Sequence, residues 1–123
     1  MFGALAHYRA SRPQAARQRL ADTMLQNLYL LPFLFHELLP KQAIWHPSNF
    51  AQPEYLWDVA EFLILPTAEE RAWIKQMYLS TPFTELRDTY LQTYGALLRE
   101  QDIENRGRIL RAWNGFLDTH SLD

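Results

Sequence analysis

Residues 81–101, TPFTELRDTYLQTYGALLREQ, carry the clearest structural signal in the chain. Large apolar side chains recur there every three or four residues, at Phe83, Leu86, Tyr90, Tyr94 and Leu97. This spacing follows one face of an α-helix, which turns once in 3.6 residues. Pro82 suits a first turn, because the amide hydrogens of a first turn have no partner within the helix. The segment therefore predicts a helix over about 82–101 that buries one face.

The preceding segment also predicts a helix, over 68–79. Thr67 and Glu70 form the pattern of a capping box, in which each side chain accepts an amide hydrogen that the first turn leaves unpaired. The apolar residues that follow have helical spacing and are Trp73, Ile74, Met77 and Tyr78. The connection at 80–82 is very short, which favours antiparallel neighbours or tight helical corners.

A last helix is expected over about 106–118, with Asn105 as its cap. We expect it to bury five apolar residues, Ile109, Leu110, Trp113, Phe116 and Leu117. Gly107 and Gly115 each weaken a helix by about 1 kcal/mol relative to Ala. Packing must therefore hold this helix in place.

In the first half of the chain, proline residues divide the apolar segments. Pro13 suits the start of a helix that runs as far as Pro32, where the missing amide hydrogen should break or kink it. A short apolar segment, 33–39, follows and stops at Pro40. A further helix is expected over about 53–65, between two more prolines, with a stripe of Leu56, Val59, Ala60 and Leu63.

These segments predict an all-α fold. Strand signals are nearly absent, with one Val and no alternating β-branched run. We expect residues 1–123 to form a single compact domain of five to six short helices, either an antiparallel bundle or an array of helical hairpins. Residues 1–12 are a candidate mobile N-terminal arm.

Composition and charge narrow the class of protein. Of 123 residues, 48% are hydrophobic and 21% charged, which is typical of a globular domain. The absence of Cys excludes disulfides and thiolate chemistry and fits a cytoplasmic location. The most apolar stretch, 28–39, is too short to span a bilayer and holds a proline, so no transmembrane segment is predicted.

The charges are unevenly placed along the chain. Residues 1–21 hold four Arg and no acid, whereas residues 42–70 hold five acids and no Lys or Arg. The simplest expectation is that the basic ends meet the acidic middle, within the fold or in a dimer. The net charge of −2 gives no overall preference for nucleic acid.

Catalytic patterns are missing. The chain has no GxSxG elbow, no glycine-rich phosphate loop and no HExxH metal motif. We therefore predict a non-enzymatic protein without a cofactor. A metal-dependent enzyme stays open as an alternative, built on His36 and His46 with a carboxylate such as Asp58 or Glu61.

The leading functional hypothesis is binding of another protein, or of a second copy of the chain. Residues 43–57, AIWHPSNFAQPEYLW, concentrate aromatic side chains in a proline-rich connection. We expect Phe50 to pack against 33–39 and Trp45 to stay partly exposed beside an acidic helix face, since exposed aromatic residues serve as anchors at interfaces. The candidate surface comprises Trp45, His46, Phe50, Tyr55, Glu54, Asp58 and Glu61.

A nucleic-acid-binding regulator is the other alternative. The corner at Pro66 resembles a helix-turn-helix, but Glu69 and Glu70 would then face phosphate. The last helix is a better candidate, with Arg106, Arg108 and Arg111, although Arg106 lies about 160° from Arg108 on the helical wheel. Two guanidinium groups on one face make few phosphate contacts.

Overall fold

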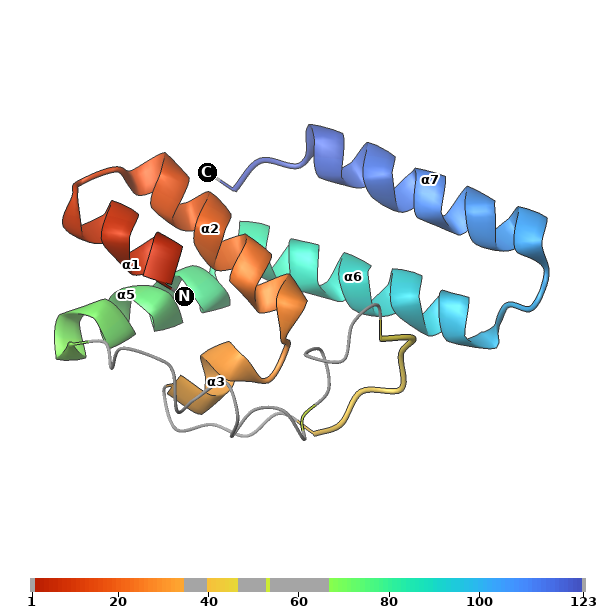
Figure 1. Ribbon diagram of the computed structural model, residues 1–123, viewed down its shortest axis with the longest axis horizontal. Helices are drawn as coiled ribbons and strands as arrows, with labels where there is room; N and C mark the ends of the chain where they lie inside the picture. The colour runs from red at the N-terminus through yellow and green to blue at the C-terminus, as the bar shows by residue number, and fades with distance from the viewer. Residues whose placement is uncertain (1, 35–39, 47–52, 54–66, 123) are drawn as a thin grey trace.

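The computed structural model describes residues 2–34, 40–46, 53 and 67–122, and these residues form six helices and no strand (Figure 1). The prediction of an all-α fold is confirmed. In chain order the helices are α1 (Phe2–Arg9), α2 (Pro13–Gln26), α3 (Leu30–Leu34), α5 (Ala68–Leu79), α6 (Thr81–Arg99) and α7 (Ile103–Thr119). The helix expected over 53–65 lies outside the described residues, apart from Pro53.

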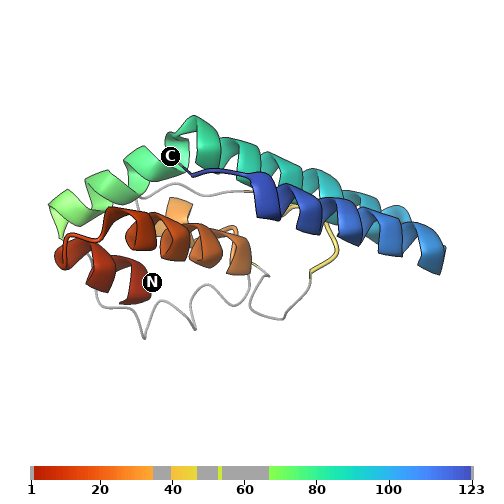
Figure 2. The same cartoon turned by 90° about the horizontal axis from the view of Figure 1, so that it is seen from above.

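Helix α6 contacts both α7 and the group of helices that includes α2 and α5. All five residues of its predicted stripe, Phe83 to Leu97, are buried. It packs against α2 and α5 at one end, and α7 runs back along it as the second arm of a hairpin. Figures 1 and 2 show that this hairpin extends well beyond the other helices.

The N-terminal helices complete the core. Helix α1 packs closely on α2, and its Ala4 and Leu5 are buried in the same cluster as Leu20, Met24 and Ile74. Sequence analysis assigned no helix to residues 2–9. The pattern was missed because an eight-residue helix shows barely two turns of spacing.

The helix predicted to run from Pro13 as far as Pro32 ends earlier than expected. Helix α2 ends at Gln26, because the Asn27 side chain accepts a hydrogen bond from the Tyr29 amide at 3.0 Å and turns the chain. Pro32 does not break a helix. It lies in the first turn of α3, where an amide hydrogen would have no partner within the helix in any case.

Helix α7 differs from its prediction at both its start and its packing. It begins at Ile103, three residues earlier than predicted. The cap is Asp102 and not Asn105, since the Asp102 side chain accepts a hydrogen bond from the Asn105 amide at 3.3 Å. Of the five residues expected in the core, only Trp113 is fully buried; Ile109 and Phe116 are partly buried, and Leu110 and Leu117 are exposed. Among the described helices α7 packs mainly on α6, and one helix cannot cover so wide an apolar face.

The capping box at the start of α5 is confirmed. The Glu70 amide donates to the Thr67 hydroxyl at 3.1 Å, and the Thr67 amide donates to the Glu70 carboxylate at 2.9 Å. Within the described segments, no helix combines the length and the apolar character needed to cross a bilayer.

Candidate functional site

Two members of the predicted protein-binding surface lie within the described residues. These are Trp45, which is exposed, and His46, which is half-buried. The other five, Phe50, Glu54, Tyr55, Asp58 and Glu61, lie outside the described residues, and so does the predicted packing of Phe50.

Trp45 is held on the surface in a fixed orientation. Its amide donates to the Tyr94 carbonyl of α6 at 2.9 Å, and the preceding residue, Ile44, is buried in the core. The indole lies parallel to the Tyr94 ring, with 5.9 Å between ring centroids and 3° between planes. The side chain remains 40% exposed, so its predicted partial exposure is confirmed. Its expected place beside the acidic helix face involves residues that are not described.

Arg106 lies over the Trp45 ring. Its guanidinium carbon lies 5.4 Å from the Trp45 ring centroid, within the range of a cation–π contact. The same group donates to the carbonyls of Leu97 and Glu100, the latter at 3.1 Å. These carbonyls end α6 and have no partner within that helix. Arg106 therefore caps α6 and contacts Trp45 at once, which sequence analysis did not foresee.

This position separates Arg106 from the other two arginines of the nucleic-acid alternative. Arg108 and Arg111 are exposed on α7, and Arg108 donates to the Asn105 side chain at 3.4 Å. The three guanidinium groups therefore do not form one phosphate-binding row. Two cations remain on the outer face, fewer than a DNA-binding footprint normally needs.

Behind Trp45 the aromatic contacts continue into the core. The Tyr94 ring lies 4.4 Å from the Tyr90 ring, tilted by 33°, and the two tyrosines make edge-to-face contacts with Trp113 at 6.1 and 5.7 Å. Burial raises the pKa of Tyr90 and that of Tyr94, so both phenols stay neutral at physiological pH. The rings thus give Trp45 a rigid support without adding a group that titrates near neutral pH.

The residues proposed for a metal site are only partly visible. His46 is described, whereas His36, Asp58 and Glu61 are not. Among the described residues, no three His, Asp or Glu side chains lie close enough to share a metal ion.

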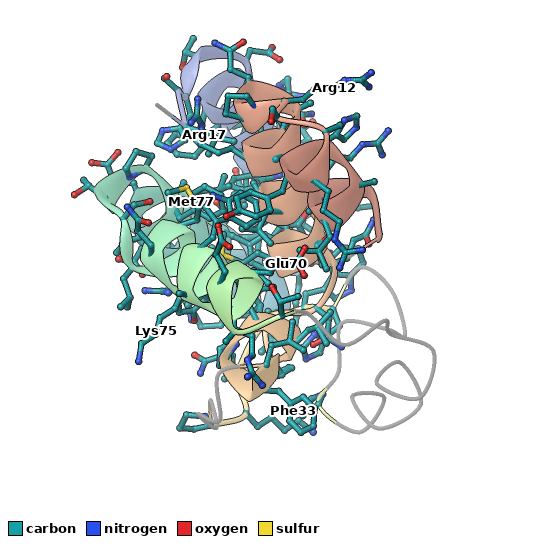
Figure 3. All side chains as sticks on the ribbon, turned by 90° about the vertical axis from the view of Figure 1, so that its left-hand side faces the viewer. Arg12, Arg17, Phe33, Glu70, Lys75 and Met77 are labelled. Carbon is teal, nitrogen blue, oxygen red and sulfur yellow. The ribbon has the colours of Figure 1, made fainter. Side chains whose placement is uncertain are left out.

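A second polar cluster joins α1 to α5. Arg9 donates two hydrogen bonds to Glu70, from Nε at 2.6 Å and from Nη2 at 2.8 Å, and Glu70 is only 3% exposed. Arg9, and then the Thr67 amide, lower the pKa of Glu70 to about 2. Figure 3 looks onto this end of the molecule and shows Glu70 between α5 and the N-terminal helices. The pair is one instance of the expected meeting of the basic N-terminus with the acidic middle.

Beside this pair lies an open cleft of about 590 Å³. Tyr8 stacks on Trp73 at 4.7 Å and donates its hydroxyl to Glu69 at 3.2 Å, and these three residues line the cleft together with Arg12. Sequence analysis did not find this cleft, because Tyr8 and Trp73 lie far apart in the chain. The only available signal was the run of basic residues near the N-terminus.

Comparison with protein families, with curated proteins and with solved structures finds no match to this chain.

Proposed function

We propose that this chain is a non-enzymatic protein-binding module that contacts another protein through Trp45 and the rest of the 43–57 segment, together with the acidic face of Glu54, Asp58 and Glu61. One observation supports the proposal above all others. Trp45 presents a large part of its indole to solvent while its backbone and ring are both fixed by α6.

The residue types around Trp45 suit this role. Trp, Tyr and Arg are the side chains most often found at energetic hot spots, and here both Tyr94 and Arg106 contact Trp45. A side chain that is already ordered loses little conformational entropy when a partner binds. The stack therefore favours binding without forming any reactive centre. A cytoplasmic location is part of the proposal and rests on the absence of Cys.

The test compares Trp45→Ala with a variant that is similarly destabilised elsewhere. About 60% of the Trp45 side chain is buried, roughly 150 Å² by the usual area of an aromatic residue. At about 25 cal/mol/Å² its loss costs up to about 4 kcal/mol, and we expect about 2–3 kcal/mol, because area-based values are upper limits. Met77→Ala, at a partly buried position on α5, should cost about 2 kcal/mol.

Tagged wild-type protein and both variants are cross-linked to their partners and used to capture them. The affinity of a captured partner for each purified protein is then measured. Trp45→Ala should weaken that affinity by more than about 2 kcal/mol, whereas Met77→Ala should leave it unchanged. Equal binding by Trp45→Ala would refute the proposal, and so would equal loss in both variants. A salt-dependent shift of DNA or RNA that is lost in Arg108→Ala/Arg111→Ala would instead favour the nucleic-acid alternative.

A further inference from the structure

The outer face of α7 carries a line of exposed apolar side chains. Ile103, Leu110 and Leu117 are 84%, 36% and 40% exposed. They are seven residues apart, and seven residues make almost two helical turns, so the three side chains lie on one stripe that drifts by only about 20° per step. Half of the six exposed large hydrophobic residues in the described part of the chain belong to this stripe.

The stripe is separate from the face that holds α7 on the molecule. That face centres on Trp113 and Ile109, which meet α6. On the helical wheel the stripe lies about 80° away from this direction. A helix with two apolar faces is fully covered only when it has two neighbours, and among the helices of the described residues Figure 1 shows α6 alone lying along α7.

A line of charges follows the outer edge of the stripe. Glu104, Arg111 and Asp118 are exposed and are again seven residues apart, each one position after a stripe residue. The line therefore alternates acid, base, acid. When two identical helices pair antiparallel about a twofold axis, the charged edge of one helix lies beside the same edge of the other. The two edges run in opposite directions. Arg111 of one copy can then lie beside Glu104 of the other, and the reverse.

A parallel pair would not use these charges. In that arrangement the charged edge of one helix faces the opposite edge of its partner, and this edge of α7 is already packed on α6. The charge pattern consequently selects the antiparallel arrangement.

Gly107 fits the centre of such a pair. In the register that places Arg111 beside Glu104, the twofold axis passes between residues 107 and 108, and Ile103 meets Leu110 of the second copy. Within one chain Gly107 is not required, because an added Cβ would meet only the flexible end of Arg111, at 3.3 Å. Without a Cβ, two helices can approach closely at this point.

We propose that α7 is the interface of a homodimer, in which Ile103 and Leu110 of each copy pack antiparallel against Leu110 and Ile103 of the other and Arg111 pairs with Glu104 across the twofold axis. In this register Leu117 lies beyond the start of the second copy's α7. This stripe adjoins the Trp45 surface at Arg106 but does not include Trp45, so either proposal can fail without the other. The stripe is smaller than the roughly 800 Å² that each partner buries in a standard interface. The dimer is accordingly weak, and it must be measured over a range from about 5 to 500 µM.

The experiment is sedimentation velocity of the full chain and its variants over that range. Wild type should shift from monomer toward dimer as concentration rises. Leu110→Glu should raise the dimer Kd by about thirtyfold or more, the effect of a hot spot. The control Leu79→Glu, at a 61% exposed position on α5, should leave the Kd unchanged, and so should Trp45→Ala.

Charge reversal then tests the orientation. Arg111→Glu makes the line wholly acidic and should raise the Kd by several-fold at low salt. The triple variant Glu104→Arg/Arg111→Glu/Asp118→Arg restores an alternating line, which pairs with itself again, and should recover wild-type association. A wild type that is monomeric throughout, an equal effect of Leu79→Glu, or a triple variant as weak as Arg111→Glu would each overturn the proposal.

Discussion

Replacing Glu70 with Gln should destabilise the protein in a way that depends on pH. The substitution keeps the size of the side chain and an oxygen that can accept the Thr67 amide, but it removes the negative charge that faces Arg9. The carboxylate has a pKa of about 2 in the folded protein, against an ordinary value of 4.5. Because the folded value is the lower one, the charged form adds stability above about pH 4.5, and that stability is lost as pH falls toward 2.

The size of the effect follows from the same values. Each pKa unit corresponds to about 1.4 kcal/mol, which gives up to about 3 kcal/mol at neutral pH. The Arg9 side chain is 50% exposed, so solvent screens the pair, and we expect about 2 kcal/mol. At pH 3 the difference between wild type and Glu70→Gln should fall to less than half of its value at pH 7.

Urea unfolding of both proteins at pH 7, 5, 4 and 3 measures this difference directly, and carboxylates common to both proteins cancel in the comparison. Glu69→Gln is the matched control, since Glu69 is the neighbouring residue, is exposed and accepts only a 3.2 Å bond from Tyr8. We expect it to cost under about 0.5 kcal/mol at every pH. If Glu70→Gln costs the same at pH 3 as at pH 7, or no more than the control, the argument for a charged link between α1 and α5 is wrong.

Three further substitutions test local features by urea or thermal unfolding. Thr67→Ala should cost about 1 kcal/mol through loss of the capping box, and a change within error would mean that the box adds nothing. Asp102→Ala should cost about 1 kcal/mol and Asn105→Ala much less, and the reverse order would restore Asn105 as the cap. Gly115→Ala should add about 0.5–1 kcal/mol, since an added Cβ there meets nothing within 4 Å; a loss of stability would point to an unseen contact.

Sequence patterns predicted most accurately those features that depend on residues close together in the chain. The stripe of α6 and the Thr67–Glu70 box both arise within one or two helical turns, and both are found as expected. The partial exposure of Trp45 followed from the prolines around it.

Features that depend on distant segments were not predictable in the same way. Arg9 and Glu70 are 61 residues apart, and no spacing rule links them. Periodicity showed which face of α7 is apolar, but it did not show that α6 covers only part of that face. The contact of Arg106 with Trp45 joined two hypotheses that the sequence kept separate.

The cap that Arg106 places on α6 has a consequence for the order of folding. It connects groups only six and nine residues apart, so the α6–α7 hairpin closes a short loop at low entropic cost. The link between Arg9 and Glu70 must instead close a loop of about sixty residues. We expect the hairpin to form first and to serve as the template on which α1 and α2 assemble. Pulse-labelled hydrogen exchange during refolding would show amides of α7 protected before those of α1, and the opposite order would exclude this sequence of events.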